Sequence, residues 1–332
     1  MPGAETKADV WITEYITPWD VYAHGVVRVL AAAETEFQAM QIVESGLPSE
    51  GGYGRALVLD GKWQSCTGDE FLYHEPLVQP GCVLFTTAAG RPPETLLILG
   101  GGEGATLREA LRWRSIRRAA MVDIDGVVVE ACKQHLVEMH RGAFDDARAD
   151  VVIDDALKFV ADDATKPEAG WDVIVSDLTD PIEDGPSFAL FTKEYYADLK
   201  RVMHKDGVLV VQAGSVNPIA MQQHARLVRT LETLFSSVLS LTSATPSYGA
   251  VWSYILASDA PIERPTDAGA VDAVLAEHVR PFSGTSLRMM DGMTMVGSFC
   301  VPKHLRDTIA AETMVYTAAS PPKFFGSGQL GG

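Results

Sequence analysis

The chain has 332 residues, of which 47% are hydrophobic and 21% are charged, a composition that is typical of a folded globular protein and excludes a disordered one. Its formal net charge of −17 disfavours nucleic acid and anionic membranes as partners and favours cations, although acidity that serves solubility alone explains the charge equally well. No apolar run approaches the ~20 residues that a membrane-spanning helix needs.

The cysteines and the N-terminus indicate a reducing compartment. The four cysteines form no CxxC pair and no Cys/His cluster with zinc-site spacing, so we expect reduced thiols and no metal site. Residues 1–10 lack the basic segment and apolar run of a signal peptide, and the expected location is therefore the cytoplasm.

The first part of the chain, from about residue 10 to residue 75, is predicted to form a small antiparallel β unit. Asp60-Gly61 lies between two strand-like segments and is a strong hairpin signal. A helix over residues 69–78 is expected to lead out of this unit. The strand candidates are residues 35–44, 55–59 and 62–67.

From about residue 94, short apolar runs alternate with helical stretches, and this alternation predicts a parallel sheet with helices on both faces. The expected fold is therefore of the α/β class. The strand candidates are residues 95–99, 118–124, 151–152, 171–176, 207–212, 238–242 and 251–257. The helix candidates are residues 105–112, 126–136 and 271–278.

The first strand of this region runs directly into a glycine-rich turn. Residues 100–104 (GGGEG) follow the strand, and a predicted helix begins at Ala105. Glycines at such a turn let the backbone approach a ligand, and the helix N-terminus adds partial positive charge. Asp123, at the end of the next strand, is placed to bind ribose hydroxyls, and Asp155, after the third strand, to reach an adenine amino group. These elements in order predict a nucleoside site, and a tight turn without a ligand is the alternative.

Glu103 distinguishes between classes of nucleoside. It lies in the turn where a pyrophosphate would otherwise bind, and its carboxylate would repel a diphosphate and attract a cation. S-adenosylmethionine and its decarboxylated form are sulfonium nucleosides, which combine adenosine with a positive charge. The turn therefore favours a sulfonium donor over NAD.

A cluster of acidic residues follows the fourth strand. Asp177 and Asp180, with Glu183 and Asp184 just beyond, lie outside the carboxyl ends of the strands, where open α/β sheets bind ligands. Taken alone, each aspartate is equally well explained by turn formation. Beside a sulfonium site, clustered carboxylates would bind the ammonium groups of a polyamine. Neutral hydrogen-bonding groups of the kind that a polar substrate needs are expected from Gln64, Tyr73, His74 and Gln212.

These segments resemble the motifs of the spermidine synthase family. Residues 59–64 (LDGKWQ) and 69–75 (DEFLYHE) are similar to its LDGxxQ and DExxYHE signature. Residues 100–109 (GGGEGATLRE) resemble its GGGxGxxxRE motif, residues 122–125 (VDID) its xxID segment, and residues 177–181 (DLTDP) its DxxDP motif. Because these motifs occur in order along most of the chain, the resemblance is specific.

The resemblance implies a role for each matching residue. Asp177 would accept the proton of an attacking amine, and Tyr73 would orient the attacking nitrogen. The donor nucleoside would be bound by Gln38, Gln64, Gly100, Gly101, Gly102, Glu103, Asp123, Ile124, Asp155, Ala156 and Pro186. The accepting polyamine would be bound by Tyr73, His74, Asp177, Asp180, Gln212 and Tyr248.

One departure from the family pattern concerns the loop after the DxxDP motif. Residues 182–193 form a loop that is two residues longer before its proline than in common spermidine synthases. This longer loop and residues 302–317 are similar to the thermospermine synthase branch of the family. Glu183 and Asp184 in the loop favour a triamine acceptor, because they would meet a third ammonium group, although two solvent-facing side chains are an equally good explanation.

The resemblance also implies a fold, a reaction and an assembly. The fold would be a Rossmann-like sheet of the S-adenosylmethionine type, with an N-terminal β-hairpin domain (1–78) and a catalytic domain (79–332). The enzyme would be an aminopropyltransferase of polyamine biosynthesis, which moves the aminopropyl group of decarboxylated S-adenosylmethionine to spermidine and releases methylthioadenosine. The product would be thermospermine or spermine. The donor is a co-substrate, no cofactor is expected, and a homodimer or homotetramer is implied.

Three other functions stay open at this point. A spermidine synthase would act on putrescine or agmatine. An S-adenosylmethionine-dependent methyltransferase shares the fold and the nucleoside motif but needs no paired carboxylates. A non-catalytic polyamine sensor would need Glu103 and Asp180 for binding but has no use for Asp177.

Overall fold

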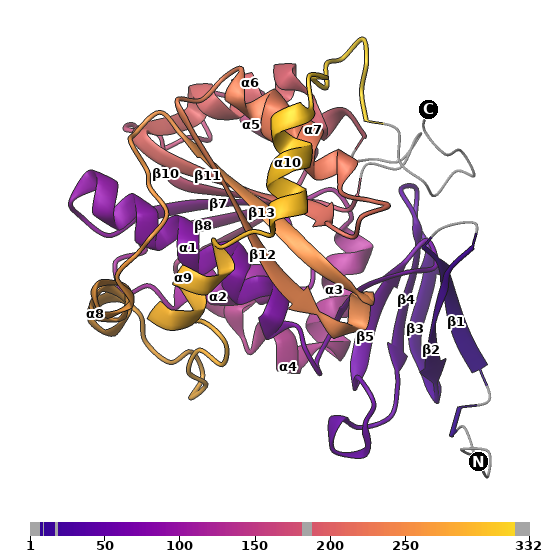
Figure 1. The fold of residues 1–332 in the computed structure, drawn as a ribbon. Coiled ribbons are helices and arrows are strands. Elements are labelled where there is room, and N and C mark those ends of the chain that lie inside the picture. The colour runs from indigo at the N-terminus through magenta and orange to yellow at the C-terminus, as the bar shows by residue number, and fades with distance from the viewer. Residues whose placement is uncertain (1–6, 9, 17–18, 181–187, 323–332) are drawn as a thin grey trace.

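The computed structural model describes residues 7–8, 10–16, 19–180 and 188–322. Figure 1 shows a smaller unit of N-terminal strands beside a larger α/β unit that is built around a central sheet. Among the described residues, no helix combines the length and apolarity needed to span a membrane.

The described part of the N-terminal unit consists of the antiparallel strands β1 (Val10–Tyr15), β2 (Val21–Val26), β3 (Arg28–Glu34), β4 (Ala39–Glu44), β5 (Arg55–Leu59) and β6 (Lys62–Cys66). The first two strands pair with each other, and the other four form a sheet in sequence order. Asp60 and Gly61 connect β5 to β6 with φ angles of 50° and 75°. Positive φ angles at both positions are typical of the type I′ turn, which forms the two-residue loop of a β-hairpin. The predicted hairpin is therefore confirmed.

The central sheet contains β7 (Thr95–Gly100), β8 (Arg118–Asp123), β9 (Ala149–Ile153), β10 (Trp171–Asp177), β11 (Met203–Ser215), β12 (Ser237–Thr245) and β13 (Ala250–Ser258). Their order across the sheet is β12-β13-β11-β10-β7-β8-β9. The strands from β11 to β9 are parallel, whereas β13 runs antiparallel to both of its neighbours. Every strand predicted for this region is present, and the expected Rossmann-like α/β fold is confirmed.

The helices of the described residues are α1 (Phe71–Ala89), α2 (Ala105–Leu111), α3 (Gly126–His135), α4 (Val137–His140), α5 (Ala156–Ala161), α6 (Lys193–Val202), α7 (Gln222–Glu232), α8 (Ala268–His278), α9 (Gly292–Ser298) and α10 (Lys303–Ala311). They cover both faces of the central sheet, as predicted (Figure 1). One hydrophobic core joins the sheet to α1, α2, α8 and α9. A second core joins it to α5, α6 and α7.

Helix α1 is longer than the sequence predicts, because it runs from Phe71 to Ala89 and not from residue 69 to residue 78. Pro76 and Pro80 lie inside it, and each lacks the backbone N–H that a helix interior uses. The helix continues through both prolines because most of its side chains are buried against the sheet. The proposed domain boundary at residue 78 falls within this helix, and the division into two domains stays a prediction.

Asp125 ties the N-terminal unit to the central sheet. Its Oδ1 accepts hydrogen bonds from the backbone N–H groups at the start of α3. Its Oδ2 accepts hydrogen bonds from the Thr35 hydroxyl at 2.7 Å and from the Gln38 amide at 3.2 Å. The loop between β3 and β4 is therefore fixed next to the carboxyl edge of the sheet.

Candidate active site

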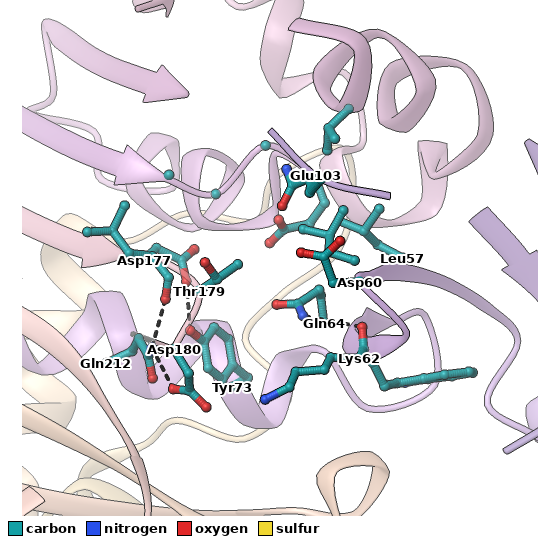
Figure 2. Close-up of a pocket in the computed structure, with 18 of the residues that line it drawn as sticks. Leu57, Asp60, Lys62, Gln64, Tyr73, Glu103, Asp177, Thr179, Asp180 and Gln212 are labelled. Carbon is teal, nitrogen blue, oxygen red and sulfur yellow. Dashed lines mark hydrogen bonds between the residues drawn. The ribbon is translucent and has the colours of Figure 1, made fainter. Parts of the chain in front are cut away.

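A cavity of about 410 Å³ lies between the carboxyl edge of the central sheet and the N-terminal unit. Figure 2 shows side chains from both sides of this cavity, with Glu103 and Asp177 on the sheet side and Lys62 and Gln64 on the side of the N-terminal unit. The cavity brings together nearly all of the residues that the sequence predicts for the site. Its lining includes Gln38, Gln64, Tyr73, Gly100, Gly101, Gly102, Glu103, Asp123, Ile124, Asp155, Ala156, Asp177, Asp180, Gln212 and Tyr248.

Two predicted parts of the site are not among the described residues of this wall. Pro186, which is predicted to bind the donor, lies outside the described residues, and so do Glu183 and Asp184 of the longer loop. His74 is fully buried and lies behind the wall.

The glycine turn, which carries Glu103, packs closely against two aspartates at strand ends. Gly100 and Gly101 have φ angles of 84° and 74°, which favour glycine. A Cβ atom on Gly100 would lie 2.2 Å from the carbonyl oxygen of Asp177, and one on Gly102 would lie 2.7 Å from Oδ2 of Asp123. The glycines therefore let the turn pack against the ends of β8 and β10, where these two aspartates stand.

Both carboxylate oxygens of Asp177 accept hydrogen bonds from hydroxyl groups. The Tyr73 hydroxyl donates to Oδ1 at 2.7 Å, and the Thr106 hydroxyl donates to Oδ2 at 2.5 Å. Burial and the nearby charge of Glu103 raise the pKa of Asp177 to about 6, although His74 and the two hydroxyl donors act in the opposite direction. The site thus holds an oriented carboxylate that is more basic than an ordinary aspartate.

His74 forms a buried ion pair with two glutamates. Its Nε2 lies 2.7 Å from Oε1 of Glu103, and its Nδ1 lies 3.1 Å from Oε2 of Glu70. Burial alone would lower its pKa, but hydrogen bonds to these carboxylates outweigh burial and raise the pKa to about 10. His74 is therefore an imidazolium that supports Glu103 from behind, which corrects its prediction as a neutral group on the channel wall. The difference arises because neighbouring residues on α1 point about 100° apart, so that Tyr73 faces the cavity and His74 does not.

Glu70 extends this charged network away from the cavity. The two guanidinium nitrogens of Arg108 donate to its carboxylate at 3.1 and 2.8 Å. Burial would raise the pKa of Glu70, but His74 and Arg108 outweigh burial and lower the pKa to about 2. The sequence does not predict these ion pairs, although Glu70 and Arg108 each lie inside a motif that carries the family resemblance.

Ligand atoms of His74, Glu103 and Asp177 lie within 4.8 Å of one another, so that their donor types and spacing are those of a metal site. Both ring nitrogens of His74 contact glutamates, however, Nε2 with Glu103 at 2.7 Å and Nδ1 with Glu70 at 3.1 Å, and a nitrogen that donates a hydrogen bond has no lone pair for a metal. The cluster fits a buried ion pair next to a proton acceptor better than it fits a metal centre.

Asp123 and Asp155 stand at the part of the cavity that is predicted to bind the nucleoside. Asp123 accepts a hydrogen bond from the backbone of Asp125 at 2.9 Å. Burial, followed by the charges of Glu103 and other neighbouring carboxylates, raises the pKa of Asp123 to about 6 despite this bond. Asp155 uses one oxygen to cap α5 through the N–H of Leu157, so that a ligand would meet its other oxygen.

The opposite part of the cavity is organised by Gln212. Its amide nitrogen donates to the carbonyl of Leu178 at 2.7 Å and to Oδ1 of Asp180 at 3.2 Å, as Figure 2 shows. Its amide oxygen accepts a hydrogen bond from Trp252 at 3.1 Å. Trp252, which is not predicted as a site residue, lines the cavity. Tyr248 also lines the cavity and donates to the backbone carbonyl of Gln64.

Acidic side chains dominate the wall. The carboxylates among the described lining residues are Glu14, Asp60, Glu103, Asp123, Asp155, Asp177 and Asp180. Of the described lining residues, Lys62 alone has a cationic side chain. Sequence reasoning missed Lys62 and Glu14 as parts of the site. A signal for Lys62 exists, because it stands two residues before Gln64 in the LDGKWQ segment, and both residues line the cavity.

The fold and this cavity together define a Rossmann-like transferase whose site suits a cationic nucleoside. A comparison with protein families supports this class, since the model of the spermine/spermidine synthase domain matches residues 70–265. The chain belongs to the spermine/spermidine synthase family.

Relatives cover the chain almost completely. A polyamine aminopropyltransferase of Synechococcus sp. (strain JA-3-3Ab) is 49% identical over 317 residues, which are 96% of this chain and 98% of that protein. A polyamine aminopropyltransferase of Sulfolobus acidocaldarius is 40% identical over 311 residues, which are 94% of this chain and 97% of that protein.

Solved structures agree with this family. A spermidine synthase in complex with the transition-state analogue AdoDATO superposes with a TM-score of 0.79 at 26% identity, over 93% of this chain and 97% of that chain. The spermidine synthase of Thermotoga maritima gives a TM-score of 0.76 at 27% identity, over 91% of this chain and 95% of that chain.

Proposed function

We propose that this protein is a polyamine aminopropyltransferase that uses decarboxylated S-adenosylmethionine and releases methylthioadenosine. One observation carries the proposal. Asp177, a basic and oriented carboxylate held by Tyr73 and Thr106, stands beside Glu103 in an acidic cavity. This nucleoside-binding fold offers both a proton acceptor and anionic groups that bind cations. Such a site suits the transfer of an aminopropyl group from a sulfonium donor to an amine. The proposed reaction involves these two substrates and no further cofactor.

The donor would occupy the part of the cavity at the glycine turn. Asp123 would bind the ribose hydroxyls, Asp155 the adenine amino group, and Glu103 the cationic chain. Gln38 and Gln64 would bind the donor from the N-terminal unit, and both line the cavity. The binding of AdoDATO by a spermidine synthase of the same fold supports this placement.

The acceptor must lose a proton before it attacks. A primary alkyl amine with a pKa of about 10.4 is neutral in roughly one molecule in a thousand at pH 7. Asp177 would accept that proton, and its raised pKa makes it a better base than an ordinary aspartate. The neutral nitrogen would then form a bond to the methylene carbon next to the sulfonium, while the carbon–sulfur bond breaks and methylthioadenosine leaves with the electron pair. Tyr73 and Asp180 would position the amine for this step.

The acidity of the cavity also selects the donor. Intact S-adenosylmethionine carries a carboxylate that would face Glu103 and Asp177, and the decarboxylated donor lacks it. We therefore expect a strong preference for the decarboxylated form. Equal affinity for the two donors in calorimetry would contradict this expectation.

For the acceptor we propose spermidine, with thermospermine or spermine as the product. The support is the long acidic loop after Asp180 in the sequence. A second candidate is spermidine synthesis from putrescine, because the two solved structures described above are named spermidine synthases.

Product analysis decides between these acceptors. The purified protein is incubated with decarboxylated S-adenosylmethionine and with putrescine, agmatine or spermidine in turn, and the products are separated by chromatography and weighed by mass spectrometry. A tetraamine formed from spermidine alone supports the triamine assignment, and its retention separates thermospermine from spermine. Spermidine formed from putrescine identifies a spermidine synthase. Absence of product with every acceptor contradicts aminopropyl transfer.

We also propose a cytoplasmic homo-oligomer, either a dimer or a tetramer. The four cysteines are free thiols, as is usual in a reducing compartment. The N-terminal strands expose Val10, Trp11 and Tyr15, and exposed apolar side chains of this kind are typical of protein interfaces. Light scattering of the purified protein tests the assembly.

A further inference from the structure

The cavity holds a lysine in a site that is otherwise built for cations. Lys62 is the first residue of β6 and follows the Asp60-Gly61 turn directly. It lines the cavity together with Glu14 and Asp180. Figure 2 shows its side chain extending into the cavity toward the side that contains Tyr73 and Asp180.

The ammonium of Lys62 interacts with carboxylates at this end of the cavity. Burial raises the pKa of Asp180, and the positive charge of Lys62 acts against this rise. Burial likewise raises the pKa of Glu14, and Lys62 again acts in the opposite direction. Glu14 also accepts a hydrogen bond from the backbone N–H of Trp63, the residue after Lys62, at 3.4 Å. Two carboxylates from different parts of the fold therefore lie within electrostatic reach of the same lysine.

The side chain of Lys62 resembles one end of the proposed polyamine acceptor. A lysine side chain is an ammonium on a four-carbon stem, and an aminobutyl end of a polyamine has the same length and charge. The stem of Lys62 is flexible, so that its ammonium can move aside when another cation arrives. An acceptor ammonium that approaches Asp180 or Glu14 therefore competes with a group that resembles it.

We propose that Lys62 is a resident counter-ion of the acceptor-binding end, competes with the distal ammonium of the acceptor for Asp180 and Glu14, and thereby sets the acceptor specificity. This inference rests on the proposed aminopropyl transfer and goes beyond it, since it assigns a competing role to a residue that binds neither substrate. An acceptor that places more charge at this end is affected more strongly than a short diamine.

Replacement of Lys62 by a neutral residue of similar length tests the proposal. Lys62→Met should lower the Kd and KM for spermidine by about threefold to tenfold, the size expected when one like charge is removed at close range in a partly hydrated site. The change for putrescine should be smaller, and the affinity for the decarboxylated donor should stay within about twofold. Lys62→Arg, which retains the charge, should behave like the original protein. Lys62→Gln serves as a second neutral variant if Lys62→Met is unstable.

Lys205 provides a matched control, because its side chain is 83% exposed and lies at the opposite end of its strand from the cavity. Lys205→Met should leave the Kd for spermidine unchanged. Unchanged or weaker spermidine binding in both neutral variants of Lys62 would overturn the inference, as would equal changes for spermidine and putrescine.

Two readouts separate this inference from the proposed function. Calorimetric titration with spermidine measures binding without turnover and decides the role of Lys62 by itself. Product analysis of the unmodified protein decides whether aminopropyl transfer occurs. Product formation with identical spermidine binding in all variants would reject the role of Lys62 and leave the proposed function intact.

Discussion

The hydroxyl of Tyr73 lies 2.7 Å from Oδ1 of Asp177 and joins the first turns of α1 to the carboxyl end of β10. Thr106 holds the other oxygen of the same carboxylate from α2. The ring of Tyr73 is itself fixed, because its backbone carbonyl accepts a hydrogen bond from Tyr254 and its ring packs edge-on against Tyr248. The proposed base is therefore oriented by side chains that have little freedom to move.

The first prediction concerns the base itself. Asp177→Asn keeps the size of the side chain and can accept hydrogen bonds, but it cannot take a proton at neutral pH. We expect kcat to fall by about a hundredfold to ten-thousandfold, the range typical of general base catalysis, with little change in donor affinity. Steady-state kinetics and donor calorimetry on one preparation measure both quantities. An unchanged kcat would remove Asp177 from this role.

The second prediction concerns the hydroxyl that orients the base. Tyr73→Phe removes one hydrogen bond that stabilises ionised Asp177, so kcat should fall by about tenfold and the pKa seen in the acidic limb of the rate profile should rise. Tyr196→Phe is a matched control, because Tyr196 is also buried and its hydroxyl has no hydrogen-bond partner among the described residues. If the control lowers kcat as much as Tyr73→Phe does, the effect is structural.

The third prediction concerns the acidic limb of the activity profile. Asp177 must be ionised to accept a proton, and burial together with Glu103 raises its pKa to about 6. The ratio kcat/KM, which reports the pKa values of the free enzyme, should therefore decline as the pH falls below about 6, and not near 4 as for an ordinary aspartate. A profile of kcat/KM from pH 5 to pH 9 checks this, with thermal unfolding at each pH as a control for stability. A flat profile down to pH 5 would contradict it.

The fourth prediction concerns the effect of the buried carboxyl group of Asp123 on the free energy of unfolding. Burial raises the pKa of Asp123 from 3.8 to about 6, so the folded state favours the protonated form, and stability is lost as the pH rises from about 4 through 6. Asp123→Asn should therefore stabilise the ligand-free protein at pH 7 by on the order of 2 kcal/mol, and by much less at pH 4. Donor affinity should fall at the same time. Urea unfolding at both pH values measures the difference, and a loss of stability at pH 7 would refute the argument.

The sequence predicts the frame of the site well, because the frame depends on local signals. The strands of the central sheet are short apolar runs, and the turn at residues 100–104 needs glycine for its backbone shape. Asp123 and Asp177 then follow at strand ends, where the parallel topology brings them together. Strand ends and glycine turns thus fix most of the nucleoside half of the cavity.

The remaining parts of the site are not predicted from the sequence, because they depend on contacts between segments that are far apart in the chain. The rotation of α1 about its own axis places Tyr73 toward the cavity and His74 toward Glu103. No local sequence pattern fixes that rotation. Glu14 reaches the cavity only because β1 lies against the hairpin that carries Lys62. The charge state of His74 likewise follows from Glu70 and Glu103, which are 33 positions apart in the chain and adjacent in space.

The fifth prediction concerns the imidazolium of His74. Its folded-state pKa of about 10 lies above the ordinary value of 6.5, so its stabilising contribution is complete below pH 6.5 and is lost as the pH rises through about 10. His74→Gln leaves the buried Glu103 and Glu70 without this cation, and loss of one partner of a buried ion pair costs about 3–5 kcal/mol. We expect a loss of that order in urea unfolding at pH 7, and a smaller loss at pH 9.5.

The control for this prediction is His224→Gln. His224 is as deeply buried as His74, but burial lowers its pKa to about 3, and it bonds to the neutral hydroxyls of Ser240 and Ser253. Because His224 is neutral throughout this range, its replacement should cost the same free energy of unfolding at pH 7 and at pH 9.5. If the His74 variant shows the same pH-independent loss as the His224 variant, His74 is neutral in the folded protein, and Glu103 must then be stabilised by some other group.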